Sequence, residues 1–173
     1  YQCDWSSDVC SSDLSSTTPR SVAPFGAVIA NEYLDALPFH IVVGRAAAPC
    51  GFLERRVAID ETGGAFDWIE TAADPAVADR LAARLADGPR LVEGQLAEIS
   101  LATDAWVASV PTLLANGLVA VLDYGRTSDV LRDAATRMAG TALAYRGHRA
   151  SSDLLGEPGE RDLTAHVDIT ALR

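Results

Sequence analysis

The sequence predicts an α/β fold, in which short apolar strands alternate with amphipathic helices. Two short apolar runs, Gly26 to Ala30 and Leu118 to Leu122, are typical of parallel strands buried on both faces. Between them, Asp74-Pro75 predicts the start of a helix, because aspartate caps a helix well and proline fits its first position. Strands and helices that alternate in this way favour an α/β domain.

Three further strands are predicted in the first half of the chain. A β-branched run at His40 to Val43 follows Pro38, which ends any helical turn in NEYLDALP. Two more runs, Phe52 to Ile59 and Ala65 to Ile69, flank the glycine-containing segment DETGG. That arrangement predicts a β-hairpin.

The helices and the later strands follow from spacing and from turn residues. The helix that opens at Asp74-Pro75 carries Val77, Leu81 and Leu85 on one face, and Gly88-Pro89 stops it. The remaining predicted elements are a helix from Thr103 to Asn116 divided at Pro111, a helix from Ser128 to Met138, and strands at Thr141 to Tyr145 and Leu163 to Val167.

Composition excludes several classes of protein. The 173 residues are 49% hydrophobic and 22% charged, which is typical of a globular domain. The net charge is −10 and all 14 basic residues are arginines, so the chain would repel the phosphates of nucleic acid. Neither a membrane-spanning run nor a signal peptide is visible, and we therefore expect no membrane partner and a cytoplasmic location.

The first fourteen residues do not read as part of the domain. Asp4 to Leu14 spell DWSSDVCSSDL, which resembles a sequencing-library adapter translated in one reading frame. The alternative is a disordered tail rich in serine and aspartate. We interpret residues 1–14 as an artefactual tail and residues 15–173 as the folded part, and we expect the chain to be a fragment.

Polar residues follow both apolar runs at the point where each predicted strand ends. Asn31, Glu32 and Asp35 come after the first run, and Asp123 and Tyr124 come after the second. Open α/β sheets bind ligands at the carboxyl ends of their strands, so these residues are candidates for a site. The alternative is that they only cap and turn the chain.

Five motifs in order resemble those of one bacterial and mitochondrial family. They are GAVIANEYLDALP (26–38), EGQLAEI (93–99), GLVAVLDYG (117–125), GTALAYRGH (140–148) and DLTAHVD (162–168). The chain is similar in this respect to the MidA family of class I methyltransferases. The resemblance implies a partial Rossmann-like methyltransferase sheet with a β-hairpin and a helical insertion. It also implies S-adenosylmethionine as cofactor and a protein substrate, an arginine in the best-known relative.

The same resemblance defines what is missing and what the strand ends would do. The family's glycine-rich cofactor loop and ribose-binding acid have no counterpart here. Residues 15–173 therefore correspond to the C-terminal portion of the domain. We expect this chain to be inactive and not to bind S-adenosylmethionine by itself. Glu32 and Asp35 are predicted to be catalytic, and Asn31, Asp123 and Tyr124 to contact the cofactor. A rival assignment makes Glu32 a cofactor contact and Asp35 a turn residue.

The sequence leaves two other possibilities, a metal site and a function without catalysis. His148, Asp162, His166 and Asp168 lie near one another in sequence but lack a metal-binding motif, and no metal is predicted. A non-catalytic partner-binding protein or respiratory-complex assembly factor is the alternative to an enzyme. The oligomeric state does not follow from the sequence.

Overall fold

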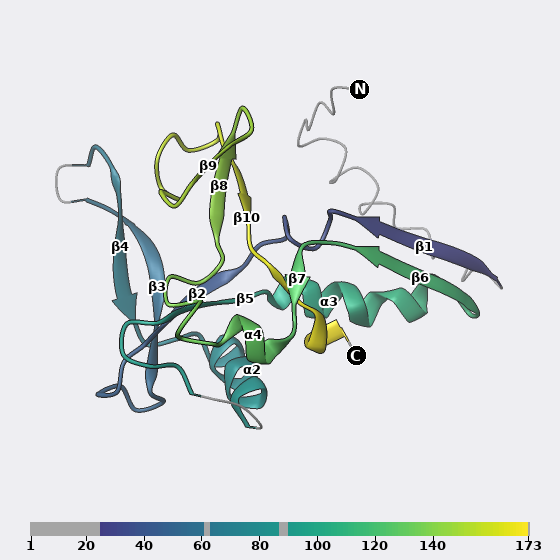
Figure 1. Ribbon diagram of the computed structural model, residues 1–173, viewed down its shortest axis with the longest axis horizontal. Coiled ribbons are helices and arrows are strands. Elements are labelled where there is room, and N and C mark those ends of the chain that lie inside the picture. Colours follow the sequence, from purple (N-terminus) through teal and green to yellow (C-terminus); the bar gives the residue numbers. More distant parts are fainter. Residues whose placement is uncertain (1–24, 61–62, 87–89, 173) are drawn as a thin grey trace.

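The computed structural model describes residues 25–60, 63–86 and 90–172, so the predicted tail at residues 1–14 lies outside the described part. Figure 1 shows several small sheets around a few short helices. The elements in chain order are β1 (Gly26–Asn31), β2 (His40–Gly44), β3 (Phe52–Ile59), β4 (Phe66–Thr71), α2 (Pro75–Leu85), β5 (Leu96–Ile99), α3 (Leu101–Ser109), η1 (Val110–Thr112), β6 (Gly117–Leu122), β7 (Gly125–Arg126), α4 (Ser128–Leu131), β8 (Leu143–Arg146), β9 (Arg149–Ser151), β10 (Asp162–Thr164), β11 (Val167–Asp168) and η2 (Ile169–Leu172).

The two apolar runs form strands that pair in parallel. β1 and β6 run side by side in full register, from Gly26 opposite Gly117 to Asn31 opposite Leu122. The prediction that both are buried is wrong: Ile29 is 71% exposed and Leu118 is 64% exposed. Within the described residues these strands pair only with each other, so nothing covers most of their apolar side chains.

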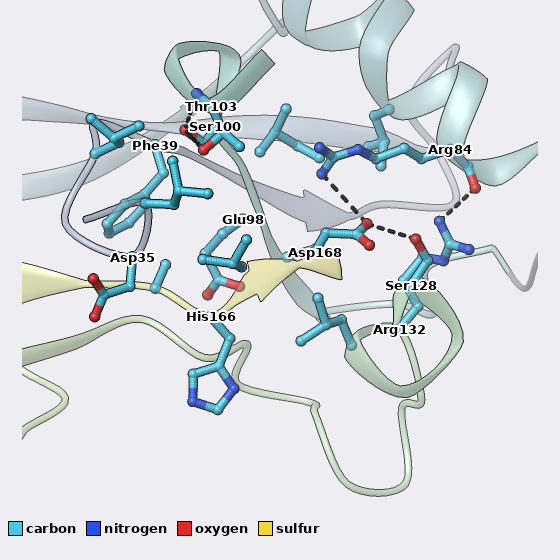
Figure 2. Close-up of a pocket in the computed structure, with 18 residues that line it drawn as sticks. Asp35, Phe39, Arg84, Glu98, Ser100, Thr103, Ser128, Arg132, His166 and Asp168 are labelled. Atoms are coloured by element: carbon cyan, nitrogen blue, oxygen red, sulfur yellow. Dashed lines mark hydrogen bonds and ion pairs between the residues drawn. The ribbon is translucent and has the colours of Figure 1, made fainter. Parts of the chain in front are cut away.

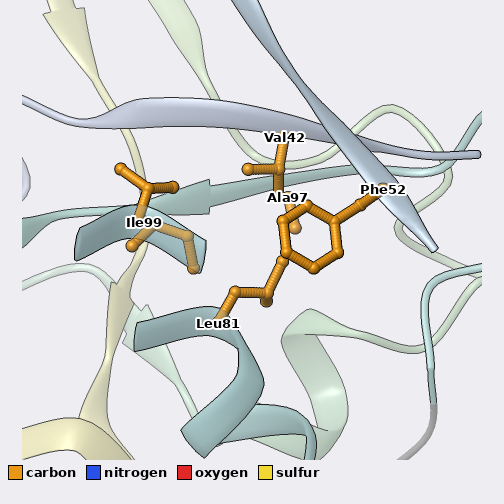
Figure 3. Packing of buried hydrophobic residues seen from close by; sticks show 6 residues of the cluster. Val42, Phe52, Leu81, Ala97 and Ile99 are labelled. Atoms are coloured by element: carbon orange, nitrogen blue, oxygen red, sulfur yellow. The ribbon is translucent and has the colours of Figure 1, made fainter. Parts of the chain in front are cut away.

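A four-stranded antiparallel sheet carries the hydrophobic core. Its strand order is β4-β3-β2-β5, and the predicted hairpin is confirmed as β3 and β4. β5 was not predicted as a strand, although its LAEI sequence lies within one of the recognised motifs. The face of this sheet packs against α2, where Leu81 lies among Val42, Phe52, Ala97 and Ile99 (Figure 3).

The first two predicted helices are confirmed with shifted ends. The Asp74 side chain accepts a hydrogen bond from the Ala76 N–H, as expected of an N-cap before Pro75. The second helix begins at Leu101 because Ser100 caps it, and the α-helix ends at Ser109. Pro111 then lies in the short 3-10 turn η1, so the expected division at this proline is present and the helix does not continue to Asn116.

The predicted third helix is mostly wrong. Only its first turn forms, as α4, and the chain beyond Leu131 runs through turns. The carboxylate of Asp133 accepts hydrogen bonds from the Ala135 N–H and the Thr136 hydroxyl, and these local bonds stabilise a turn in place of a helix.

The last two predicted strands are correct in kind but shifted or divided. β8 begins at Leu143 and pairs with both β9 and β10. The run from Leu163 to Val167 is split, because β10 ends at Thr164 and pairs with β8, whereas β11 begins at Val167 and pairs with β7. The chain therefore changes sheets at residues 165–166.

These elements confirm the α/β class. Parallel pairs (β1–β6 and β11–β7) coexist with antiparallel sheets and short helices. Within the described ranges, every helix is too short or too polar to span a bilayer.

The core assignment predicts that two identical substitutions have different effects on stability. Leu81 is 1% exposed, so Leu81→Ala removes buried apolar surface and leaves a cavity, which lowers the free energy of unfolding by about 2–5 kcal/mol. The matched Leu118→Ala, at an exposed position of β6, lowers it by about 1 kcal/mol or less. Urea unfolding followed by circular dichroism measures both, and equal losses would contradict the assigned core.

Candidate active site at the ends of β1 and β6

The carboxyl ends of β1 and β6 meet, as the sequence predicted. The Glu32 N–H donates to the Leu122 carbonyl over 2.8 Å and extends the pairing by one residue. One carboxylate oxygen of Asp123 accepts the N–H groups of Tyr33 (3.2 Å) and Leu34 (2.8 Å), and the other accepts the Tyr124 N–H (2.8 Å). Asp123 therefore fixes the turn that follows β1 to the end of β6.

A pocket of about 450 Å³ opens beside this turn, and we call it the acidic pocket. Three of the predicted site residues (Glu32, Asp35 and Tyr124) form one of its walls. The remaining lining residues come from β8, from β10 and from the segments next to them: Thr141, Leu143, Tyr145, His148, Asp162, Thr164, Ala165 and His166.

The second wall follows from strand geometry. Asp162 is the cross-strand partner of Tyr145, and Thr164 is the partner of Leu143. Side chains two residues apart on a strand share a face, so these four lie together on the face that lines the pocket.

Asp35 is the most buried of the pocket's carboxyl groups. It is 8% exposed, and its Oδ1 atom has no hydrogen-bond partner among the described residues. Burial raises the pKa of Asp35, and the nearby carboxylates of Asp123 and Glu32 raise it further. A bound cation or hydrogen-bond donor would relieve both effects.

Tyr124 extends the negative wall towards solvent. Its hydroxyl donates to Glu32 Oε1 over 3.4 Å, and the negative charge of Glu32 raises the pKa of Tyr124. Tyr124 is 59% exposed, so its ring stands at the mouth of the pocket.

The acidic pocket contains several carboxylates and no arginine. Several carboxylates elsewhere pair with arginine, as Glu70 does with Arg45 and Glu157 does with Arg161 (2.7 Å each). No arginine lines the acidic pocket, and within the described residues none of its three carboxylates has an ion pair. The pocket thus contains three carboxylates that have no ion pair among the described residues.

The turn that carries Glu32 and Asp35 is not helical. The chain makes a bend there, and Glu32 adopts a left-handed backbone with φ of 46°. His148, also on the pocket wall, has φ of 63°. The φ of His148 is that of the two-residue turn Gly147-His148 between β8 and β9, which requires a positive φ at both positions. The left-handed conformation of Glu32 lies outside such a turn, and strained residues of this kind occur often at binding sites.

The other two predicted site residues, Asn31 and Asp123, do not line the acidic pocket. Asn31 is exposed at the end of β1, and Asp123 lies behind the turn that it holds. Tyr145 was missed as a site residue, and so was the role of Asp162, because only the pairing of β8 with β10 brings them to this wall. Within the described ranges, no group of three histidine, cysteine, aspartate or glutamate side chains could hold a metal ion.

A smaller cavity of about 50 Å³ lies inside the domain next to the acidic pocket (Figure 2). Asp35 and His166 line both cavities. At the other end of Figure 2, Asp168 accepts a 2.6 Å hydrogen bond from the Ser128 hydroxyl and lies 3.8 Å from the Arg84 guanidinium. Asp168 is therefore a partner of Arg84 in the interior and does not line the acidic pocket.

The fold of this chain is similar to that of two solved proteins. Two solved structures of COG1565 superfamily proteins from Burkholderia thailandensis match the fold of this chain, each with a TM-score of 0.75. The first, described as a likely methyl transferase bound to S-adenosyl-homocysteine, is 34% identical in sequence. The second, a native structure, is 35% identical. Each match covers 88% of this chain but only 38% of the solved chain. A search of curated proteins finds no match.

A family model described as "Putative S-adenosyl-L-methionine-dependent methyltransferase" matches residues 5–173. That match spans far more than half of the sequence and agrees with the structural similarity. The chain belongs to this methyltransferase family.

Proposed function

We propose that this chain supplies the substrate pocket of an S-adenosylmethionine-dependent methyltransferase that acts on an arginine side chain of a protein. The observation that carries the proposal is the acidic pocket, with three carboxylates that no arginine of the described residues neutralises. The family match and the neighbour bound to S-adenosyl-homocysteine support the cofactor. The narrower MidA assignment and a cytoplasmic location are also proposals, the first supported by the five ordered motifs.

The charge of the pocket fits a cationic substrate. A unit charge pair about 4 Å apart is worth about 1 kcal/mol in bulk water but about 4 kcal/mol at an effective dielectric constant of about 20. Asp35 is buried and lacks a partner for one oxygen, so a guanidinium donor would satisfy an atom that is now unpaired. Glu32 lies at the more exposed side and can accept from the same planar cation.

Bound S-adenosylmethionine supplies an electrophilic methyl group on a sulfonium. Glu32 and Asp35 orient the attacking nitrogen and hold the charge of the guanidinium on its other nitrogens, which leaves the attacking one more nucleophilic. The nitrogen forms its bond to the methyl carbon as the carbon–sulfur bond breaks, and the electron pair stays on sulfur. The nitrogen must then lose a proton, and Asp35, whose pKa is raised, is placed to accept it.

The predicted cofactor contacts are also part of the proposal. Asn31 and Tyr124 are exposed at the ends of β1 and β6, where family members of this fold class bind ligands. Asp123 uses both carboxylate oxygens to hold the turn, so its contribution is to keep these neighbours in place.

Glu32→Gln in the full-length protein tests the catalytic assignment. We expect methylation of an arginine-containing protein substrate to fall at least about a hundredfold, because the carboxamide cannot balance the substrate's charge. Affinity for S-adenosylmethionine, measured by calorimetry, stays within about twofold. Asp79→Asn, at an exposed position of α2, serves as the control for loss of one negative charge.

Either of two results would contradict this assignment. Methylation that survives Glu32→Gln removes the catalytic role. A fall in cofactor affinity favours the rival assignment, in which Glu32 contacts the cofactor. A protein that binds arginine peptides but transfers no methyl group would instead be the non-catalytic partner-binding protein.

Asp35→Asn should stabilise the chain while it abolishes activity. The folded pKa of Asp35 is raised, so its contribution to stability is complete below the unfolded pKa of about 3.9 and is lost as pH rises through the folded value. Asparagine avoids that loss and can donate to Asp123. The Tm should therefore rise by a few degrees at pH 7, and the difference should shrink as pH falls towards about 4. A lower Tm at pH 7 would show that the charged carboxylate is structural.

A further inference from the structure

The part of the acidic pocket that β8 and β10 supply carries a paired aromatic ring and carboxylate. Asp162 on β10 and Tyr145 on β8 are direct cross-strand partners, and both line the acidic pocket. Their neighbours on the same strands point away: Leu163 lines a separate groove with Trp68, and Ala144 is fully buried. The register of two strands thus presents these two side chains to the pocket.

The two walls have matching chemistry. On the first wall, Asp35 is 8% exposed and its buried Oδ1 has no hydrogen-bond partner among the described residues, and Tyr124 lines the same pocket. On the second wall, Asp162 has no ion pair among the described residues and Tyr145 is 37% exposed. A ligand in the pocket would therefore meet a carboxylate and an aromatic ring from each of the two groups of lining residues.

We infer that Asp162 and Tyr145 are the residues that make the pocket select a guanidinium over a lysine ammonium; this inference rests on the proposed function. A guanidinium is planar and presents five N–H donors, so carboxylates from separate segments of the pocket lining can accept from different edges of one cation. Its flat face also packs against a tyrosine ring. An ammonium is a compact charge with three donors and has no flat face to pack against a tyrosine ring.

Binding of amino-acid probes to this chain tests the inference. The probes are Nα-acetyl-arginine amide, the lysine equivalent, and the uncharged citrulline equivalent, each titrated into ¹⁵N-labelled protein and followed by NMR chemical shifts. We expect the arginine probe to bind at least about tenfold more tightly than the lysine probe, and the citrulline probe to bind more weakly than either.

The variants separate recognition from general charge. Asp162→Asn should weaken binding of the arginine probe at least about tenfold and Tyr145→Leu about threefold, while Tyr145→Phe keeps the ring and stays within about twofold. Asp79→Asn removes one negative charge from α2, away from the pocket, and should leave binding unchanged. Backbone shifts outside the pocket report whether each variant is folded.

The outcomes distinguish this inference from the proposed function. Arginine preference that depends on Asp35 but is unaffected by Asp162→Asn and Tyr145→Leu overturns the inference alone. If the unmodified chain binds none of the probes, the proposed arginine substrate is overturned and the inference with it. If Asp162→Asn weakens the arginine and lysine probes equally, Asp162 attracts cations in general and does not select a guanidinium.

Discussion

The carboxylate of Asp123 is the contact on which the site depends. β1 and β6 bring their carboxyl ends to one edge, but pairing alone does not determine the path of the chain beyond them. Asp123 accepts N–H groups from Tyr33, Leu34 and Tyr124, which would otherwise need other partners. Because three backbone groups converge on this one side chain, Glu32 and Asp35 are carried to the same pocket.

That arrangement is unfavourable for the fold taken by itself. Glu32 has a left-handed backbone, which costs roughly 1–2 kcal/mol at a non-glycine residue, and Asp35 is buried beside two other carboxylates. Arginine is abundant in this chain and pairs with acids elsewhere, yet none lines the pocket. Unneutralised charge in a preformed pocket is what a site for a cationic ligand requires, because the ligand then provides the missing partner.

Part of this structure could be predicted from local sequence. Capping by Asp74 and the glycine turn between β3 and β4 are local, and they gave a correct helix start and a correct hairpin. The acids after β1 and β6 could be placed because parallel strands end at a common edge. Burial of those strands could not be predicted, since it depends on neighbours that apolar runs do not specify. The wall of Tyr145 and Asp162 depends on the register between β8 and β10, which turn residues alone do not determine.

A crystal structure of the full-length protein with S-adenosyl-homocysteine and an arginine-containing peptide tests the central claim most directly. The account predicts the guanidinium within the acidic pocket, with Asp35 Oδ1 accepting from it and the attacking nitrogen directed towards the sulfur of the cofactor product. A guanidinium bound elsewhere, with the amino group of S-adenosyl-homocysteine paired to Glu32 and Asp35, would contradict it and assign these carboxylates to the cofactor.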